Sequence, residues 1–482
     1  MGAHGIPTRS HLGVLLRLSA GVMVIAAVLT SAPGGVIRPA SYSARASASA
    51  TKPSIVFILT DDQRWDTLPW MPNVKRLLVA KGIKFTNGFV PNSLCCPSRT
   101  SILTGKYSHS TGVWGNERPY GGFPAFRQDG STIATWLHGA GYRTALVGKY
   151  LNQYSDAAHH HYIPPGWDRW VSFAADNSRY YDYDLTVNGH IVHHGHTAAD
   201  YATDVFANKA TGFIRETRGP LFLYFAPPAP HEPYTPAPQD AEGCPNLPPY
   251  RPPSLGEADV ADKPAYVRNI DWTSKDARTA GWIRRGQCKS LLDVDRSVAH
   301  IVAALSATHR LSNTMIVFTS DNGYMWGEHR LLHKAKPYDE ASRVPLVVRY
   351  DPVTTTPRQE ARIALNIDIA PTFAALAGVG APGAEGRSLL PLIKGMSVPW
   401  RTDFLLEHTV VDEAVRVPDY CGLHATTWSY VMYSTGAEEL YDLRSDPYQL
   451  TNLARRSSQQ DRRKHMRTRV MQWCRPLPPG FG

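Results

Sequence analysis

The stretch from Cys95 to Gly105 carries side chains that could do chemistry. A thiol, a rigid proline, a hydroxyl and a fixed cation stand within five residues, and a helix-compatible run follows them. A thiolate is a nucleophile and an oxidisable group, and a nearby arginine such as Arg99 favours the anion. The alternative interpretation is a pair of buried cysteines beside a turn, for which no such neighbours are needed.

Two pairs of polar residues follow apolar runs and could bind a metal ion. These pairs are Asp61-Asp62 after residues 54–60 and Asp321-Asn322 after residues 315–320. Each run is continuous and rich in β-branched residues, which is typical of buried parallel strands, and such strands end at one edge of a sheet. Three carboxylates at one edge repel each other unless a cation lies between them. Oxygen ligands suit a hard ion such as Ca²⁺ or Mg²⁺.

Two other interpretations of the acidic pairs remain open. Asp61-Asp62 could be a helix cap followed by a turn. A zinc site fits less well, because no close pair of histidines or cysteines accompanies either acidic pair.

The elements that must position these residues alternate between strands and helices. We expect strands at residues 54–60, 143–147, 221–225 and 315–320, and helices at 71–81, 131–139 (capped by Ser131), 199–216 and 285–306. This alternation predicts an α/β fold with a large, mainly parallel or mixed sheet flanked by helices. We also expect an irregular insertion near the substrate at residues 159–196 and a long proline-rich loop at 226–264.

The pattern changes beyond about Pro391. Short strands are expected at residues 404–407, 426–433 and 439–442, with a basic helix at 457–473. Apolar residues are too few there for a strong independent core, so we expect a small antiparallel α+β subdomain packed on the first domain. The predicted organisation is a leader with a small-residue linker at 1–50, a catalytic α/β domain at 51–390 and a C-terminal subdomain at 391–482.

The amino terminus is typical of a secretory signal peptide. Arg9 and Arg17 precede an apolar run from Leu18 to Leu29, and small residues with several A-x-A cleavage options follow. The run is short for a membrane span. We therefore predict a secreted or cell-surface protein without stable membrane insertion after cleavage, and an uncleaved anchor is the alternative.

The composition and net charge of the chain limit the kinds of molecule that it is expected to bind. Hydrophobic residues make up 43% of the chain and charged residues 19%, as in an ordinary globular protein, and the formal charge is +10. A moderately basic chain suits an anionic substrate. Nucleic-acid binding is not expected, because basic residues do not cluster with aromatic ones; the basic run at residues 455–469 is interpreted as a solvated helix face.

The motif Cys95-x-Pro-Ser-Arg, followed by Leu-Thr-Gly, resembles the signature of the formylglycine-dependent sulfatase family. In that family the first cysteine is oxidised after synthesis to formylglycine, so the resemblance gives Cys95 the catalytic position and leaves Cys96 as the variable one. Gly-Lys-Tyr-Leu-Asn at residues 148–152 is similar to the N-acetylglucosamine-6-sulfatase branch, whereas many sulfatases have a histidine where Leu151 stands. The resemblance implies a fold of the alkaline-phosphatase/sulfatase type.

The resemblance also implies a role for each candidate residue. Calcium, which the resemblance favours over Mg²⁺, would be bound by Asp61, Asp62, Asp321, Asn322 and the formylglycine hydrate at Cys95. Arg99 would hold that hydrate. Lys149 and Lys334 would contact the sulfate, and His231 together with Lys334 would protonate or stabilise the leaving oxygen. Taken alone, Lys149 and Lys334 would be interpreted as solvated surface lysines and His231 as a loop histidine. What distinguishes them is that all three are expected at the ends of strands.

The implied mechanism follows from charge. A sulfate ester is an anion whose sulfur is shielded by its own oxygens, so cations must neutralise it and a strong nucleophile must arrive in line. One hydroxyl of the hydrated aldehyde at Cys95 would lose its proton to an aspartate, attack sulfur and expel the alcohol. The second hydroxyl would then let the covalent sulfate leave and would return the aldehyde, a step that a plain serine or cysteine lacks.

We therefore predict a calcium-dependent sulfatase that acts on a sugar O-sulfate, such as N-acetylglucosamine 6-sulfate in a glycosaminoglycan-like chain. Its maturation would require a formylglycine-generating enzyme. The alternatives are a phosphodiester or phosphonate hydrolase of the same superfamily, an arylsulfatase without sugar specificity, and a carbohydrate-binding module with a relict site. Of the six cysteines, we expect Cys421 to pair with Cys474, because both lie in the C-terminal part and the protein is exported.

Overall fold

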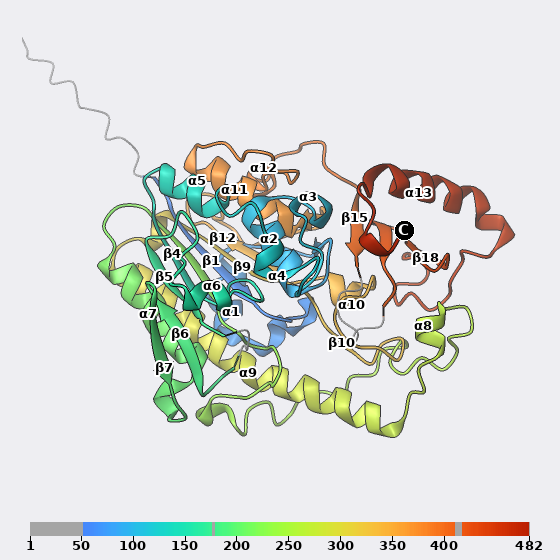
Figure 1. Cartoon of the computed structure of the whole chain (residues 1–482), viewed down its shortest axis with the longest axis horizontal. Helices are drawn as coiled ribbons and strands as arrows, with labels where there is room; N and C mark the ends of the chain where they lie inside the picture. The colour runs from blue at the N-terminus through green and yellow to red at the C-terminus, as the bar shows by residue number, and fades with distance from the viewer. Residues whose placement is uncertain (1–51, 176–178, 410–416, 482) are drawn as a thin grey trace, which may run out of the picture. The chain divides into compact units, whose positions relative to one another are not determined.

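A large mixed sheet forms the centre of the described structure (Figure 1). The computed structural model describes residues 52–175, 179–409 and 417–481, and the predicted leader lies outside them. Within these residues the sheet has ten strands in the order β13-β2-β12-β9-β1-β8-β4-β5-β6-β7. Their bounds are β1 Ser54–Thr60, β2 Ile83–Phe85, β4 Arg143–Gly148, β5 Arg169–Phe173, β6 Tyr183–Val187, β7 His190–His194, β8 Leu221–Ala226, β9 Thr314–Ser320, β12 Leu346–Arg349 and β13 Arg358–Glu360.

Parallel pairing dominates the middle of the sheet. β1 pairs in parallel with β8 and β9, and β4 pairs in parallel with β8 and β5. β12 is antiparallel to both of its neighbours, and β6 and β7 extend the other side as antiparallel strands. The predicted α/β fold with a mainly parallel or mixed sheet is confirmed.

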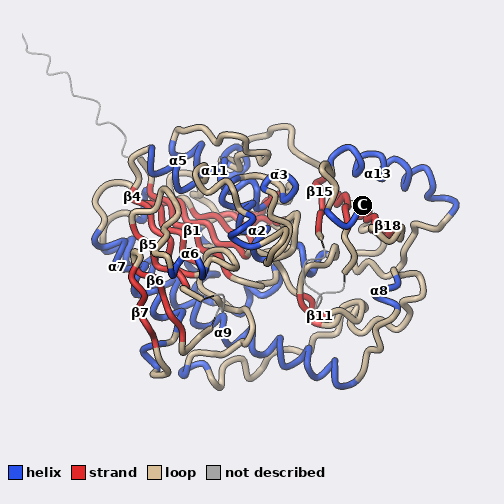
Figure 2. Tube along the Cα trace, viewed as in Figure 1, coloured by secondary structure: helices blue, strands red, loops and turns tan. Residues whose placement is uncertain are grey.

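Helices cover both faces of this sheet (Figure 2). One face carries α2 (Cys95–Thr104), α5 (Ile133–Gly139) and α11 (Ile369–Ala377), and the other carries α1 (Pro72–Leu77), α7 (Ala202–Glu216) and α9 (Ser274–Ala307). Parallel strands need crossover connections, which place helices on the faces of the sheet. The central strands are therefore shielded from water on both sides.

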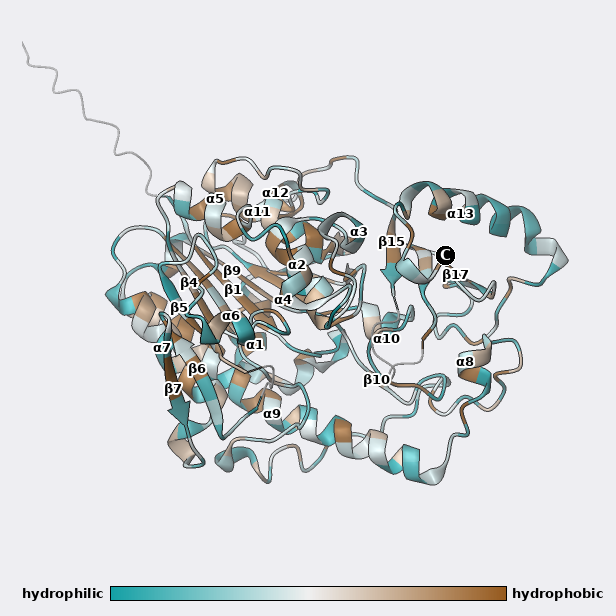
Figure 3. Ribbon diagram, in the orientation of Figure 1, coloured by the Kyte–Doolittle hydropathy of each residue, from teal (hydrophilic) through white to brown (hydrophobic). Residues whose placement is uncertain are grey.

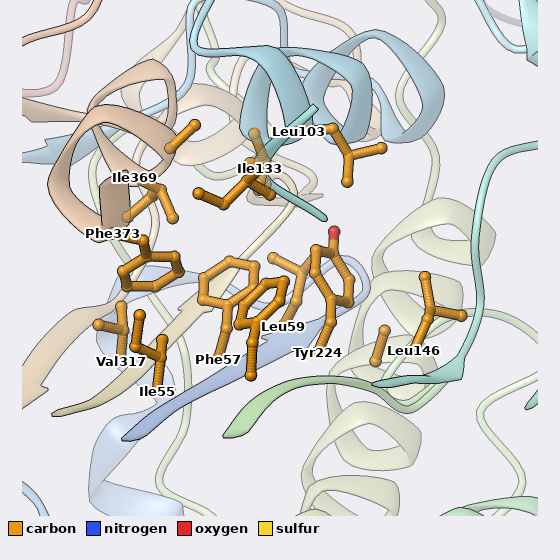
Figure 4. Packing of buried hydrophobic residues seen from close by; sticks show 14 of the residues in the cluster. Ile55, Phe57, Leu59, Leu103, Ile133, Leu146, Tyr224, Val317, Ile369 and Phe373 are labelled. Carbon is orange, nitrogen blue, oxygen red and sulfur yellow. The ribbon is translucent and has the colours of Figure 1, made fainter. Parts of the chain in front are cut away.

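Side chains of β1 alternate between the two helical layers. Ile55 and Phe57 lie on the face of α2, α5 and α11, where the rings of Phe57 and Phe373 have centroids 5.7 Å apart (Figure 4). Val56 and Ile58 point to the opposite face, towards α7 and α9. All of them are buried, which explains why the strand reads as a continuous apolar run rather than an alternating one. Each such side chain contributes about 1.5–3 kcal/mol by leaving water.

Helix α9 begins earlier than predicted, at Ser274 instead of residue 285. Thr273 caps it: its hydroxyl oxygen accepts from the backbone N–H of Asp276 at 3.4 Å, and its own backbone N–H donates to the Asp276 carboxylate at 2.8 Å. The first turns of α9 are polar and exposed, so the sequence shows no apolar stripe there.

Helix α5 also starts differently from the prediction. Its cap is Thr132, which forms a capping box with Thr135, and not the preceding Ser131. The backbone N–H of Thr132 donates to Thr135 Oγ1 at 3.0 Å. Serine is by type the slightly better cap, so the sequence alone favoured the wrong one of the two adjacent hydroxyl residues.

The prediction of an irregular insertion at residues 159–196 is wrong. This segment contains β5, β6 and β7, which form one edge of the large sheet. Trp170 and Val171 of β5 are fully buried. The residues of β7 are mostly exposed and polar, as befits an edge strand, and this hides the strand from a search for apolar runs.

A second, antiparallel sheet forms near the carboxyl end of the chain, as predicted. Its described strands are β15 (Asp403–His408), β16 (Tyr420–Ala425), β17 (Trp428–Tyr433) and β18 (Glu438–Asp442). The sequence predicted β15, β17 and β18 but not β16. The domain boundary between residues 390 and 391 stays a prediction.

Helix α13 (Gln460–Trp473) packs on this second sheet through Met466 and Val470. The remainder of the helix is strongly hydrophilic (Figure 3). A disulfide joins Cys421 to Cys474, so the predicted pair is confirmed, and a further disulfide joins Cys244 to Cys288. Among the described residues, no helix has the length and apolar character that crossing a membrane requires.

Candidate active site

The two acidic pairs meet at one edge of the large sheet. β1 and β9 run in register up to Thr60 and Ser320, so the residues that follow them are neighbours. The backbone N–H of Asp62 donates to Asp321 Oδ1 at 3.1 Å, and Asn322 Nδ2 donates to Asp62 Oδ1 at 2.7 Å. All four side chains are buried. These four residues, called the acidic cluster below (Asp61, Asp62, Asp321 and Asn322), are therefore held together at this edge of the sheet by hydrogen bonds and burial.

Residues that the sequence did not single out hold the acidic cluster in place. Asp62 has a φ of 69°, in the left-handed region that is costly for a non-glycine residue. The next residue is fixed across the sheet, because the backbone N–H of Gln63 donates to Ser320 Oγ at 2.8 Å. Thr60 Oγ1 donates to Gln63 Oε1 at 2.8 Å. The only sequence feature that pointed to Thr60, Gln63 and Ser320 was their position next to the acidic pairs.

Cys95 is the first residue of α2 and is fully buried beside the acidic cluster. Its thiol donates to Asp61 Oδ1 at 3.4 Å and accepts from Lys334 Nζ at 2.9 Å. Burial and the charge of Asp61 raise the pKa of this thiol to about 12, because the opposing effects of Lys149 and Lys334 are smaller. The expectation that the surroundings favour a thiolate is therefore wrong for the unmodified cysteine.

Arg99 contacts the acidic cluster rather than the thiol. Its Nε donates to Asp321 Oδ2 at 2.8 Å and its Nη1 donates to the carbonyl of Lys149 at 2.8 Å. Its Nη2 lies 3.4 Å from Asp61 Oδ2 and, among the described residues, has no hydrogen-bond partner. Arg99 thus has one buried donor to offer to a bound group.

Two lysines balance the carboxylates. Lys149 Nζ donates to Asp61 Oδ2 at 2.5 Å, and Lys334 Nζ donates to the two oxygens of Asp62 at 2.6 and 2.8 Å. Burial alone would lower the pKa of both ammonium groups, but the carboxylates outweigh it and raise both values. Both lysines therefore carry a full positive charge at neutral pH.

His231 lies on the open side of the site. Its Nε2 is 3.7 Å from Asp62 Oδ2, and its Nδ1 bonds to the carbonyl of Glu232 at 2.8 Å, so Nδ1 carries the proton in the neutral ring. Burial, and next Lys334, lower the pKa of this imidazole. Its side chain is 27% exposed, whereas those of Lys334 and Asp61 are 12% and 0% exposed. A substrate would meet His231 and Lys334 first.

The donor set fits a divalent cation. Ligand atoms of Asp61, Asp62, Cys95 and His231 all lie within 4.8 Å of one another. Asn322 Oδ1 is buried and has no hydrogen-bond partner within the described residues. Carboxylate and amide oxygens are the ligands that calcium prefers. The cluster can thus hold a metal ion, with oxygen atoms as its main donors.

A hydrogen-bonded chain of three side chains supports the loop that carries Lys334. β10 (Met325–Trp326) pairs with β11 (Leu332–His333), and Lys334 follows this hairpin directly. His333 Nδ1 bonds to the hydroxyl of Tyr324 at 2.7 Å, and that hydroxyl bonds to Tyr234 at 2.7 Å. Tyr234 lies 90 residues before Tyr324, so no local pattern in the sequence could have joined it to the hairpin.

Known proteins are similar to this chain in sequence and in fold. Human N-acetylglucosamine-6-sulfatase is 32% identical over 464 residues, which cover 85% of this chain and 82% of that protein. The extracellular sulfatase SULF-1 homolog of Drosophila melanogaster is 35% identical over 378 residues, which cover 75% of this chain and 33% of the fly protein. The solved structure of BT4656 in complex with its substrate D-glucosamine-2-N,6-O-disulfate has a TM-score of 0.77 at 24% identity, covering 88% of this chain and 97% of that one.

Family patterns cover most of the described chain. The pattern described as Sulfatase matches residues 53–379 and includes every residue of the acidic cluster. The pattern described as N-sulphoglucosamine sulphohydrolase, C-terminal, matches residues 327–475. With the N-acetylglucosamine-6-sulfatase relative at 32% identity over most of both chains, these matches agree with the fold, and the chain belongs to the sulfatase family of sulfuric ester hydrolases.

Proposed function

We propose that this sulfatase hydrolyses a sugar O-sulfate of the N-acetylglucosamine 6-sulfate type. The observation that carries the proposal is the convergence of Lys149, Lys334 and His231 on the acidic cluster and Cys95. Cations grouped around one buried position suit a tetrahedral anion. The human relative is named for the 6-sulfate of N-acetylglucosamine, and the BT4656 structure holds a glucosamine disulfate, which supports a sugar as the alcohol part.

Each residue would have a separate task in the reaction. Lys149 and Lys334, both charged, would neutralise the sulfate oxygens, and the buried Nη2 of Arg99 would donate to an oxygen of the group at Cys95. Lys334, which is charged, and His231, in its protonated imidazolium form, would stabilise or protonate the leaving alcohol oxygen when the sulfur–oxygen bond breaks, because these two side chains are the nearest to solvent. Asp61 would accept the proton of the attacking hydroxyl, since it already accepts from the thiol.

Two additions to the chain are part of the proposal. Calcium would be held by the acidic cluster and, when bound, would supply Lewis-acid stabilisation of negative charge. Cys95 would be converted to formylglycine by a formylglycine-generating enzyme, and its Sγ marks where the oxygens of the hydrate would lie.

We also propose that the protein is exported. The charged, apolar and small-residue segments of the first 50 residues follow the order of a secretory signal. The Drosophila relative is named an extracellular sulfatase. Both disulfides are compatible with an oxidising compartment.

The proposal is tested by comparing matched esters. The enzyme, co-expressed with a formylglycine-generating enzyme and supplied with Ca²⁺, is assayed on N-acetylglucosamine 6-sulfate, the 6-phosphate of the same sugar, an aryl sulfate and a phosphonate monoester. We expect the highest kcat/KM on the sugar sulfate. His231→Gln should lose about 10²- to 10⁴-fold, whereas His138→Gln, a side chain that is 52% exposed, should not. A preference for the phosphate or phosphonate would contradict the proposal, and equal rates on aryl and sugar sulfates would remove the sugar specificity.

A further inference from the structure

A buried ion pair between Arg64 and Glu328 lies next to the acidic cluster and has no part in the reaction described above. Arg64 comes two residues after Asp62, and its side chain is 1% exposed. Glu328 lies in the turn between β10 and β11, and its side chain is 0% exposed. Nη1 of Arg64 donates to Oε1 of Glu328 at 2.5 Å. The two residues are 264 positions apart in the sequence, so the pair joins segments that only the fold brings together.

Every N–H group of the Arg64 guanidinium has an acceptor. Besides the bond to Glu328, Nη1 donates to the carbonyl of Tyr324 at 3.1 Å. Nε and Nη2 donate to the two carboxylate oxygens of Asp66 at 3.0 and 2.9 Å, and Nη2 also donates to the hydroxyl of Tyr250 at 2.9 Å. The donors lie in the fixed plane of the guanidinium. A planar group that is bonded on all sides restricts how the segments around it can be arranged.

Glu328 is held from its own side as well. Its Oε2 accepts from the backbone N–H of Trp326 at 2.6 Å, and its Oε1 also accepts from the hydroxyl of Tyr250. The indole of Trp326 lies against the guanidinium, with 4.0 Å between Arg64 Cζ and the ring centroid. A cation over an aromatic face is attracted to it. The pair therefore fixes the turn of the hairpin to the strand end that carries the acidic cluster.

The same hairpin leads directly to Lys334. β11 ends at His333, and Lys334 is the next residue. Its Nζ lies 2.6 and 2.8 Å from the two oxygens of Asp62 and 2.9 Å from Cys95 Sγ. Because a lysine side chain is long and flexible, the place of its ammonium group depends on where the backbone is held. Arg64 is linked to both sides of this contact, to Asp62 through the chain and to Lys334 through the hairpin.

Stability alone does not account for this pair. Replacing a buried ion pair by well-packed apolar residues is often neutral or stabilising, because taking two charges out of water is costly. Aromatic rings of Trp65, Tyr250 and Trp326 already lie within 5.1 Å of the Arg64 Cζ atom. Charge-assisted hydrogen bonds add geometric specificity that an apolar contact does not supply. The pair is therefore suited to fixing a position.

We propose that Arg64 and Glu328 are positioning residues for the reaction, because their ion pair holds the hairpin where Lys334 Nζ reaches Asp62 and Cys95. The inference rests on the role proposed above for Lys334 and extends it to the pair that holds the hairpin. Without the pair, the hairpin would shift and misplace the ammonium group. A misplacement of about 1 Å can lower a rate by about a hundredfold.

The test measures kcat on N-acetylglucosamine 6-sulfate and on an aryl sulfate, in calcium-loaded enzyme and per molecule of formylglycine found by mass spectrometry. Glu328→Gln keeps the shape of the side chain and removes its charge, whereas Arg64→Lys keeps the charge and removes the planar group. We expect kcat to fall about ten- to a hundredfold in each variant. Turnover of the aryl sulfate alone would contradict the proposed sugar substrate, and the variants are then compared on that ester.

The matched control breaks a similar ion pair in which neither residue belongs to the site. Asp240 accepts from Nη1 and Nη2 of Arg296 at 2.8 and 2.5 Å, and its side chain is 6% exposed. Asp240→Asn, like Glu328→Gln, exchanges a buried carboxylate for an amide beside an arginine. It should keep the wild-type kcat, and a loss equal to that of Glu328→Gln would show that the effect is not specific to the hairpin and would overturn the inference.

Combination with Lys334→Ala separates positioning from a general loss of structure. If Glu328 acts through Lys334, Glu328→Gln should have no further effect on kcat once Lys334 is replaced, whereas independent effects multiply. Arg64→Lys serves in the same comparison if Glu328→Gln does not fold. Equal fold-losses in both backgrounds, or a wild-type kcat in both Glu328→Gln and Arg64→Lys, would overturn the inference and leave the sulfatase function intact. A wild-type kcat in Lys334→Ala would contradict the role proposed for Lys334 itself.

Discussion

Asn322 is the residue whose surroundings indicate a metal ion most directly. Its Nδ2 donates to Asp62 Oδ1 at 2.7 Å and to the carbonyl of Gly323 at 2.8 Å. Its Oδ1 is buried and, among the described residues, lacks a partner. An unsatisfied buried acceptor costs about 1–3 kcal/mol, and a cation at this position would remove that cost.

This contact predicts how Asn322→Ala responds to calcium. We expect Ca²⁺ to raise the Tm of the wild-type protein, because an ion that binds the folded state stabilises it. The variant lacks one ligand, and a tenfold weaker Kd would remove about 1.4 kcal/mol of that stabilisation. Thermal unfolding with chelator and with added Ca²⁺ measures the difference, and Asn208→Ala, at an exposed position of α7, is the control. Identical calcium responses of Asn322→Ala and wild type would exclude Asn322 as a ligand.

The acidic cluster could be predicted from local motifs, whereas the residues that hold it in place could not. Asp61 and Asp321 each follow a buried strand, so two local patterns were enough to place them at one edge. The contact of Gln63 with Ser320 joins residues 257 positions apart, and neither residue type indicates a site. The pKa of Cys95 also could not be derived from its neighbours in the sequence, because burial, which decides it, depends on the whole fold.

At the level of single elements, the short helix α5 depends on its capping residue. Thr132 forms the capping box, and Ile133 and Leu137 of the same helix are buried against the sheet. Thr132→Ala should lower the free energy of unfolding by about 1 kcal/mol. Ser131→Ala removes an adjacent hydroxyl that is not the cap and should change it by less than about 0.5 kcal/mol. Chemical denaturation of both variants decides between the two positions, and a larger loss for Ser131→Ala would contradict the assignment.

Strands buried on both faces were predicted correctly, and exposed elements were not. β1, β4, β8 and β9 are continuous apolar runs, because both of their sides pack under helices. β7 and the first turns of α9 are mostly exposed and mix polar residues with scattered apolar ones such as Ile191, Val192 and Trp282, so they show neither period. The periodic spacing of apolar residues shows which side of an element is buried. It therefore cannot reveal a strand or helical turn that is exposed and held mainly by backbone hydrogen bonds.

At the scale of the whole molecule, Glu407 connects the second sheet to the layer of helices that carries Cys95. This residue of β15 is fully buried and accepts from the backbone N–H of Ser108 at 2.5 Å. It also bonds to His109 Nδ1 at 2.7 Å. Ser108 and His109 belong to α3 (Ser108–Thr111), which follows α2. A buried carboxylate that loses such partners is strongly destabilising.

The hydrogen-bonded pair of His109 and Glu407 predicts a contribution to the free energy of unfolding that depends on pH. Burial alone would lower the pKa of His109, but the hydrogen bond and the charge of Glu407 outweigh it and raise the pKa. A raised pKa in the folded state means that the stabilisation is complete below the unfolded value of about 6.5 and is lost as the pH rises through the folded value. His109→Asn should therefore cost roughly 1.5 kcal/mol at about pH 5.5 and less at about pH 9. Urea unfolding at both pH values, with His138→Asn as control, measures this, and an equal cost at both would refute it.

The central claim is that Cys95 works as an aldehyde hydrate and not as a thiol. Peptide mass spectrometry across Cys95 to Arg99, performed on preparations with and without a co-expressed formylglycine-generating enzyme, measures the converted fraction. We predict that sulfatase activity per molecule rises in proportion to that fraction and is absent when only thiol is found. Full activity in protein whose Cys95 is an unmodified thiol would contradict the account.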